Sequence, residues 1–519
     1  MRKVIFVVLA LALVTGMVFA GGGQQQQQTG DRPGVARNRA TDHLVWGMGS
    51  SPVNLDPSGA NDTASSQLAR NIFETLVVMD ENNAPTIPGL AERWVWDDPT
   101  RLRVFIRQNV RFHNNDILTA NDVKFTLERA AVSPQVGHIT NMINRVDVIN
   151  NNEAVIVLDY PFVPFLAHLA HSATGIVNER AVREMGDAAF GRNPVGTGPM
   201  RFDSWITGVS VDLVRFDGYW GGRKALQRVT FRIIPDPSTR QIALETGEID
   251  VNGVAAQDVP RVLANPNLQV YRRWNLATEY IGYNMSRTPF NDVRVRQAIN
   301  YALDKEVIAR VAYPNVGRPT AGPINTMVWG STADQLQPFE YNQARARQLL
   351  AEAGYPNGFT THILVSDGGA SRIDAAEIAQ NMLAQVGITA TVRILEWGAF
   401  LDATAQGDMD MFILGWVTVT GDPDYGLHPL FHVDNFGARG NRGFYNNPRV
   451  NTLLDQGRQE TNPTQRAAIY REVQQIIRDE SPWIFIQAGE VVMAAHPAMR
   501  GFEPTPVGSH DVFNVYFEW

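Results

Sequence analysis

The chain of 519 residues contains no cysteine. This absence excludes disulfide bonds and every mechanism in which a thiol acts as the nucleophile. An exported chain without cysteine also avoids oxidative mispairing during folding.

Charge is sparse as well, because Asp, Glu, Lys and Arg make up only 19% of the residues and the net charge is −8. No basic stripe is present, which argues against nucleic acid as a partner. Hydrophobic residues make up 44%, which is typical of a folded globular protein rather than a disordered one. A chain of this length predicts two or three domains.

The sequence lacks the common catalytic motifs: His-Glu-x-x-His, the Walker phosphate loop and the nucleophile elbow. The best candidate for a metal site is the run Asp422, Asp424, His428 and His432. The two histidines would share a face of a helix, but Pro423 and Pro429 predict a surface loop there instead. We therefore expect no catalytic residue, no metal and no cofactor. His168 and His171, in the apolar stretch FLAHLAH, are expected to be partly buried and hydrogen-bonded.

The N-terminus has the pattern of a secretory signal peptide, residues 1–20. Arg2 and Lys3 precede an apolar run, and Val18-Phe19-Ala20 places small residues at −3 and −1 of a cleavage site after about Ala20. The alternative is an uncleaved anchor, but about 17 residues are marginal for crossing a bilayer. Residues 21–40, rich in Gly and Gln, are expected to form a flexible leader.

Hydrophobic periodicity predicts alternating helices and strands. We expect strands at 43–48, 102–107, 362–365, 389–395 and 411–416, and helices starting near 120 and 292 and covering 342–353, 373–386 and 463–480. Asn291 or Asp292 is the expected N-cap of the helix near 292, and Asn462 is the expected N-cap of the last helix, with Pro463 at its first position. Such alternation predicts two α/β lobes built on a mainly parallel sheet that is covered on both faces.

Five runs in order resemble one family. They are residues 89–129, 194–220 with the turn Gly196-Thr197-Gly198-Pro199 and the later DGYWGG, 236–250 (DPSTRQIALETGEID), 284–308 and 444–486. Together they resemble the extracytoplasmic solute-binding proteins of bacterial peptide and nickel ABC importers, known as family 5. The segment GWVTVTGDPDYGLHPLF (415–431) is most similar to the glutathione-binding branch.

The resemblance implies an α/β, two-lobed periplasmic-binding-protein fold of type II, in the large peptide-binding class. Lobe I would comprise residues 41–278 and 489–519, with an extra subdomain inserted at about 59–190, and lobe II residues 279–488. The implied function is a periplasmic receptor that closes over a short or modified peptide, such as a dipeptide, an oligopeptide or glutathione. It would deliver this ligand to the permease subunits of an ABC importer. We expect a monomer that is not an enzyme and, without cysteine, carries no lipid anchor.

The resemblance also places the ligand anchors of dipeptide-binding members. Their aspartate for the ligand's ammonium falls at Val419 here, and their arginine for its carboxylate falls at Ser366 or Asp367. A simple dipeptide is therefore not the expected ligand. A modified peptide, an oligosaccharide or a metal chelate stays open.

The candidate ligand-binding residues lie on the first loop, after the expected hinge, and at strand ends, where open α/β sheets bind ligands. They are Asn54, Tyr283, Asn284, Arg372, Trp397, Trp416, Asp422 and Asp424. Arg372 could pair with a carboxylate through two hydrogen bonds. Each tryptophan could belong to the core instead, and the two aspartates could serve turn structure.

Two other classes of function remain as alternatives. An exported hydrolase would need a nucleophile with a base, or an open metal site. A chaperone-like protein would use a broad cleft to bind unfolded chains.

Overall fold

The computed structural model describes residues 40–80 and 87–519. The predicted signal peptide and all of the predicted leader except residue 40 lie outside the described residues. Within the described part of the chain, no helix combines the length and the apolar character needed to cross a bilayer.

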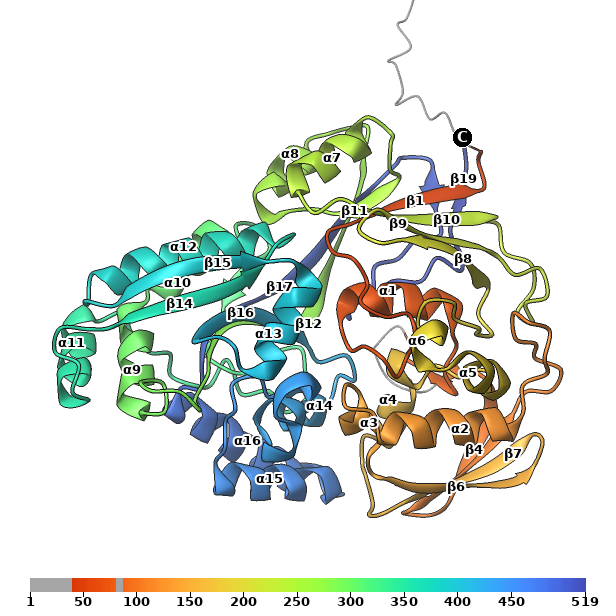
Figure 1. Cartoon of the computed structure of the whole chain (residues 1–519), viewed down its shortest axis with the longest axis horizontal. Helices are drawn as coiled ribbons and strands as arrows, with labels where there is room; N and C mark the ends of the chain where they lie inside the picture. Colours follow the sequence, from red (N-terminus) through yellow and green to blue (C-terminus); the bar gives the residue numbers. More distant parts are fainter. Residues whose placement is uncertain (1–39, 81–86) are drawn as a thin grey trace, which may run out of the picture.

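One sheet of eleven strands runs through both halves of the molecule (Figure 1). Its order is β15-β14-β16-β12-β17-β11-β1-β10-β9-β8, and β13 pairs with β17 outside this path. The strands are β1 (His43–Met48), β8 (Met200–Ile206), β9 (Ser210–Arg215), β10 (Arg228–Ile233), β11 (Val251–Gly253), β12 (Gln269–Tyr283), β13 (Gly317–Pro319), β14 (Thr360–Ser366), β15 (Thr389–Leu395), β16 (Met411–Val417) and β17 (Trp483–Ala495).

The sheet is mixed, so the prediction of a mainly parallel sheet is wrong. β14 is parallel to β15 and β16, as the strand–helix alternation predicts, and β1 is parallel to β10 and β11. The long strands β12 and β17 instead run antiparallel to each other, and β12 is antiparallel to β16. They join the two parallel groups into one sheet.

β12 and β17 pass from one half of the molecule to the other. Gln269–Trp274 pairs with Glu490–Ala495, and Thr278–Gly282 pairs with Trp483–Ala488, with a shift of register between the two stretches. This interruption lies where the sequence predicts the passage between lobes. The bounds of the lobes themselves stay a prediction.

Helices cover the sheet in the half formed by β12, β14, β15 and β16 (left in Figure 1). They are α9 (Val293–Ala302), α10 (Lys305–Ala312), α11 (Gln343–Glu352), α12 (Ala370–Ala384), α13 (Trp397–Gln406), α14 (Pro423–Phe431), α15 (Pro448–Gln459) and α16 (Pro463–Glu480). Their N-caps follow the sequence, since Asp292 accepts from the N–H of Arg294, and Asn462 accepts from Thr464 and Gln465. Two apolar cores, centred on Ile299 and Phe431, fill this half.

The other half carries a second, four-stranded sheet in the order β4-β5-β7-β6. The strands of this sheet are β4 (Ala91–Asp98), β5 (Arg101–Ile106), β6 (Ile143–Asn150) and β7 (Glu153–Leu158). The same half contains the separate strand pair β2 (Val77–Val78) and β3 (Ile87–Pro88). Its helices include α1 (Thr63–Ile72), α2 (Ala120–Ala131), α3 (Gly137–Thr140), α4 (Phe165–Leu169), α5 (Glu179–Met185) and α6 (Asp187–Phe190). α7 (Pro237–Glu245), α8 (Val259–Leu263), β18 (Met499–Arg500) and β19 (Tyr516–Phe517) complete this half. Separate cores lie under the small sheet and between α1 and the large sheet.

α14 corrects the prediction of a loop at residues 422–432. Pro423 occupies the first helical position, where a missing N–H costs nothing. Pro429 removes the hydrogen bond to the Tyr425 carbonyl four residues earlier, but the indole Nε1–H of Trp416 donates to that carbonyl at 2.9 Å. A side chain from β16 therefore satisfies the group that the proline leaves unpaired.

Replacing Trp416 with Phe should destabilise the protein by about 1–3 kcal/mol, because the buried carbonyl loses its donor. In a Pro429→Ala background the same change should cost about 1 kcal/mol less, because the alanine supplies a helical N–H to that carbonyl. Urea unfolding of the four proteins of this cycle measures the coupling. Equal losses in the two backgrounds would show that the indole does not serve this carbonyl.

Candidate ligand-binding site

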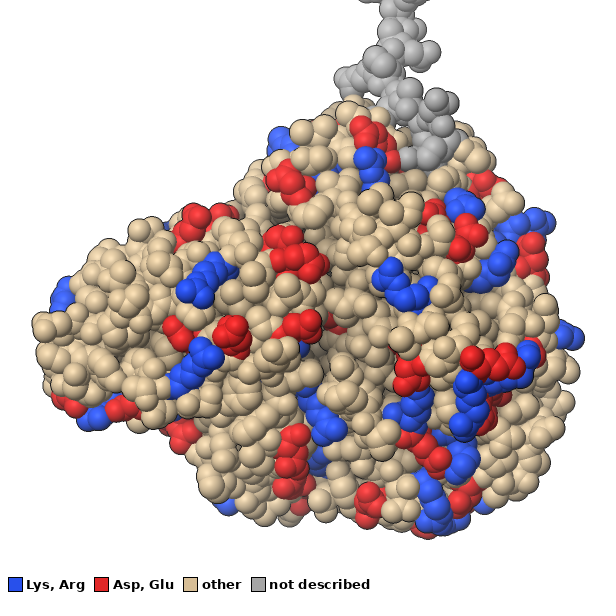
Figure 2. Space-filling view, in the orientation of Figure 1, with Lys and Arg blue, Asp and Glu red and all other residues tan. Residues whose placement is uncertain are grey.

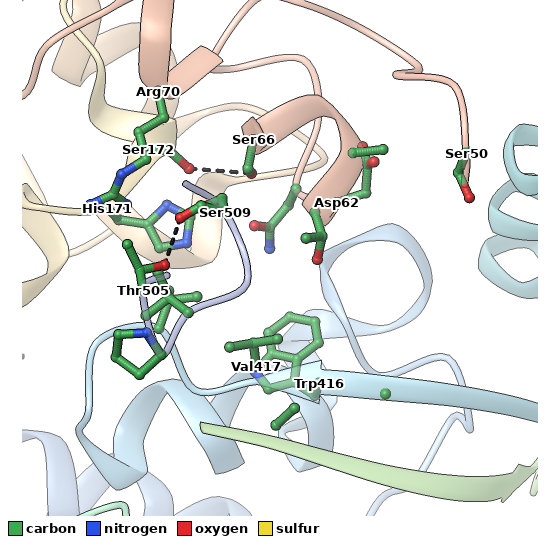
Figure 3. A pocket seen from close by; sticks show the side chains of 18 of the residues that line it. Ser50, Asp62, Ser66, Arg70, His171, Ser172, Trp416, Val417, Thr505 and Ser509 are labelled. Carbon is green, nitrogen blue, oxygen red and sulfur yellow. Dashed lines mark hydrogen bonds between the residues drawn. The ribbon is translucent and has the colours of Figure 1, made fainter. Parts of the chain in front are cut away.

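A cavity of about 890 Å³ lies where the two halves meet. One side is formed by α1, by residues 78–80 and 170–172, and by the C-terminal segment 501–514. The other side is formed by the ends of β14 and β16 and the starts of α12 and α13, and β12 runs between the two. Figure 3 shows Arg70, Ser66 and Asp62 along α1, with Trp416 and Val417 across the space.

Three of the eight predicted site residues line this cavity: Arg372, Trp397 and Trp416. All three follow or end strands of the large sheet, as the strand-end argument predicts. The positions equivalent to the dipeptide anchors, Val419 and Ser366-Asp367, also line it. These positions therefore reach the cavity without offering the ion pair that a dipeptide would need.

Arg372 is already paired with a carboxylate of this chain. Its Nε and Nη2 donate to Glu279 at 2.8 and 2.9 Å. Burial alone would lower the pKa of Arg372, but Glu279 raises it above the usual value. The guanidinium is thus neutralised from β12, and a ligand carboxylate would have to compete with Glu279.

Trp397 connects the two halves directly. It is the first residue of α13, and its indole N–H donates to Oδ1 of Asp62, the N-cap of α1, at 3.2 Å. Its ring stacks on Phe400 with centroids 5.9 Å apart. One face of the cavity is therefore tied to the other through the carboxylate of Asp62.

Five predicted residues do not line the cavity. Tyr283 is 0% exposed and stacks on Phe290 within the core of its half, at a stretch of β12 that is buried on both faces. Asn284 is also buried, and its Nδ2 donates to the carbonyls of Gly407 and Met409. Both residues therefore brace the end of β12 instead of facing a ligand.

Asn54 and Asp422 serve local structure. Asn54 accepts from the N–H of Asp56 at 2.9 Å and packs against two glycines. Asp422 caps α14 and accepts two hydrogen bonds from Arg466, both at 2.7 Å. This is the turn role that the sequence left open for the aspartates.

Asp424 belongs to a contact between the halves beside the cavity. It is 1% exposed, lies 3.1 Å from Nε of Arg458 and 3.5 Å from Nε2 of His168. Burial would raise the pKa of its carboxyl, but Arg458 and His168 hold that pKa below its ordinary value. Asp424 therefore remains an anion that joins α14 to the opposite half.

A histidine–tyrosine cluster, made of His138, His168, His171 and Tyr425, extends this contact. The Tyr425 hydroxyl lies 3.0 Å from Nε2 of His171 and accepts from Nδ2 of Asn61 at 3.1 Å. The ring of Tyr425 also packs against all three imidazoles. The prediction that His168 and His171 are hydrogen-bonded is confirmed, and both side chains are fully buried instead of partly buried.

The predicted metal run is divided in the structure. His428 and His432 face Asp455 of α15, and not Asp422 or Asp424. The backbone N–H of Asp434 donates to Nδ1 of His432, so the neutral ring carries its proton on Nε2, toward Asp455 at 3.5 Å. Arg458 adds positive charge 3.2 Å from Nε2 of His428. The geometry favours a hydrogen-bonded cluster over a cation site.

Two charged residues of the cavity went unnoticed in the sequence. Asp62 is 8% exposed, and its Oδ2 has no hydrogen-bond partner among the described residues. Burial raises the pKa of its carboxyl. Arg70, two turns further along α1, lines the cavity and forms no salt bridge within the described part of the chain, although the charge of Asp511 acts on it. The spacing Asp62, Ser66, Arg70, one every four residues, was the available signal.

Comparison with known proteins agrees with this architecture. Residues 86–438 match the model of the bacterial extracellular solute-binding proteins, family 5. The glutathione-binding protein GsiB of Salmonella typhi is 32% identical over 475 residues, covering 89% of this chain and 92% of that protein.

Solved structures give the same picture. The periplasmic binding protein DppA of Helicobacter pylori, in complex with the peptide STSA, superposes with a TM-score of 0.87 at 27% identity, covering 92% of this chain and 98% of that one. The oligopeptide-binding protein AppA of Bacillus subtilis, in complex with a nonapeptide, gives 0.86 at 26%, covering 92% and 99%. The chain is a member of the family 5 bacterial extracellular solute-binding proteins.

Proposed function

We propose that this protein is a periplasmic receptor that captures a short or modified peptide in the cavity and delivers it unaltered to an ABC-type permease. The observation that carries the proposal is a cavity lined from both halves of the molecule, with direct contacts between the halves at its rim. A ligand in this cavity touches both halves only while they are together. It therefore favours the closed state, and a shift from mostly open to mostly closed needs about 5 kcal/mol of preference.

The charges of the cavity support a charged, peptide-like ligand. Its lining includes four arginines and six acidic residues: Arg70, Arg273, Arg372, Arg442, Asp62, Asp80, Glu279, Asp367, Glu503 and Asp511. A neutral oligosaccharide would leave such groups desolvated without a counter-charge. The names of the relatives, which bind glutathione, a tetrapeptide or a nonapeptide, point the same way.

In this proposal the residues that line the cavity, and not the outer surface, determine which ligand is bound. On the face shown in Figure 2, acidic and basic side chains are interspersed, and no broad area of that face carries one sign of charge. Because Val419 and Ser366 cannot supply the ion pairs of the dipeptide mode, we infer a ligand longer than a dipeptide, or a modified one such as glutathione.

The remaining parts of the proposal follow from family membership and the N-terminal pattern. The mature protein would begin after about Ala20, act as a freely diffusing monomer in the periplasm and dock on permease subunits. Lobe I would comprise residues 41–278 and 489–519, and lobe II residues 279–488.

Ligand capture should be visible as both stabilisation and closure. Tri- and tetrapeptides or glutathione at about 100 times Kd should stabilise the mature protein by about 2.7 kcal/mol. Thermal unfolding and small-angle scattering, with mass spectrometry of the recovered ligand, measure the two effects and the ligand's integrity. A response only to oligosaccharides would redirect the ligand class, and a chemically converted peptide would indicate a hydrolase.

The affinity should fall in acid because of His171. In the closed structure burial, with His168 and Arg70 nearby, lowers the pKa of His171 to about 3. If opening restores the ordinary value near 6.5, protons bind the open state preferentially. Closure is then fully favourable above pH 6.5 and weakens as the pH falls from 6.5 toward 3.

Titration calorimetry should show that the affinity for glutathione falls about tenfold from pH 7.5 to pH 5.5 through the protonation of this one group. His138 and Asp424 also face the cluster, so His171→Gln should reduce the pH dependence without abolishing it. An unchanged pH profile in that variant would contradict the role of His171.

A further inference from the structure

We propose that α1 supplies both ionic anchors for the ligand: Asp62 binds its ammonium group and Arg70 binds its carboxylate. The inference rests on the proposed function, because it presumes that the cavity holds a peptide-like zwitterion. It identifies the residues that take the place of the absent dipeptide anchors. It also sets the length of the ligand.

Asp62 has one oxygen engaged and one free. Oδ1 accepts from the N–H of Ser65 at 3.0 Å and from the indole of Trp397 at 3.2 Å. Oδ2 is buried without a hydrogen-bond partner in the part of the chain that the structure describes. Leaving a buried carboxylate oxygen unpaired is unfavourable, because the oxygen has lost its water without gaining a donor. An ammonium group in the cavity would supply the missing donor together with the opposite charge.

The cations of the cavity near Asp62 are engaged elsewhere. Nη1 of Arg442 donates to the carbonyl of Leu401 and to Oγ1 of Thr404, both at 2.6 Å. Arg372 is paired with Glu279. The charge of Arg442 acts on Asp62, but among the described residues no side-chain cation forms a salt bridge with the free oxygen of Asp62.

Arg70 lies at the other end of the same face of α1. It lines the cavity and has no ion pair or hydrogen bond with a described side chain, although Asp511 is near enough to offset part of the effect of burial on its pKa. The planar guanidinium offers two parallel N–H groups, which match a carboxylate. Ser66 lies between the two charges, and its hydroxyl accepts from Ser172 at 3.3 Å.

The spacing of the two residues selects ligand length. Positions 62 and 70 are eight residues apart, so they are separated by about 12 Å along a helix that rises 1.5 Å per residue. An extended peptide advances about 3.3–3.6 Å per residue, so three or four residues span this distance. A dipeptide, at about 7 Å, reaches one anchor but not both. Glutathione, a tripeptide, falls within the preferred range.

The arrangement also couples binding to closure. A ligand held by Asp62 and Arg70 is bound to one half only. The indole of Trp397, from the other half, then donates to the same carboxylate that holds the ammonium. The ligand and the closing half thereby stabilise one buried anion together, which gives the closed state its preference.

The test uses two conservative variants of the mature protein and a set of related peptides. Asp62→Asn removes the charge but keeps an oxygen for Ser65 and Trp397, so the cap of α1 is retained. Arg70→Gln removes the guanidinium. Matched controls are Asp236→Asn, the cap of α7, and Arg310→Gln on α10, since neither residue lines the cavity. The ligands, measured by calorimetry, are dialanine, tetra-alanine, N-acetyl-tetra-alanine and tetra-alanine amide.

We expect Asp62→Asn to weaken the binding of tetra-alanine at least tenfold. N-acetylation of the peptide should weaken binding to the wild type but should have no further effect on binding to this variant. Arg70→Gln should likewise weaken the binding of tetra-alanine. C-amidation of the peptide should weaken binding to the wild type but should have no further effect on binding to this variant. Dialanine should bind the wild type more weakly than tetra-alanine, and the control variants should match the wild type.

Failure of the inference and failure of the proposed function give different results. If the wild type binds none of these peptides, the inference falls, and the peptide proposal falls with it only if glutathione also fails to bind. If the wild type binds tetra-alanine, and N-acetylation and C-amidation weaken binding to each variant as much as they weaken binding to the wild type, the anchors lie elsewhere and the receptor function stands. A cross-pattern, in which Asp62→Asn removes sensitivity to amidation, would overturn the assignment of the two ends.

Discussion

The antiparallel pairing of β12 with β17 is the constraint on which the rest of the structure depends. These two strands carry the sheet from one half to the other, and their ladder is interrupted between Trp274 and Thr278. A break in register at this point leaves a short stretch with few hydrogen bonds between two well-paired stretches. A bend at this point would move each half as a body, because each half keeps its own apolar cores. The cavity beside this break is therefore the place where a small local change alters the distance between many side chains.

Closure has to bury polar groups from both halves, and each must find a partner there. Tyr425 does so with Asn61 and His171, and Asp424 with Arg458 and His168. Such contacts add specificity of fit more than net energy, since the desolvation of each group offsets much of what its new bond contributes. A receptor benefits when the contacts at the rim of the cavity contribute little net free energy to closure. The empty protein is then free to open, and the ligand provides the decisive preference.

Much of the fold could be predicted because local signals and tertiary packing agree. The caps Asp292 and Asn462 and the parallel pairs of β14 with β15 and β16 lie where the pattern indicates. The incorrect predictions concern residues whose contacts come from elements that are distant in the sequence. Pro429 argues against a helix until Trp416, on another element, satisfies the carbonyl of Tyr425. Strand ends led to Trp397 and Trp416, and the ability to pair with a carboxylate led to Arg372. Tyr283 and Asp422 resemble site residues only until their core and ion-pair partners are known.

Asp62 shows why a cap can conceal a binding residue. An aspartate before a helix needs no explanation beyond the amide it accepts from, so sequence reasoning stops at that role. The cap uses only Oδ1, and the position of the helix decides what happens to Oδ2. Here the N-terminus of α1 faces the opposite half, where burial without a partner is unfavourable for an anion. Because Arg70 at the same cavity wall forms no salt bridge with a described side chain, α1 presents two opposite charges at a fixed separation. A rigid helix holds that separation far more constant than two loops could, which is what discrimination by ligand length requires.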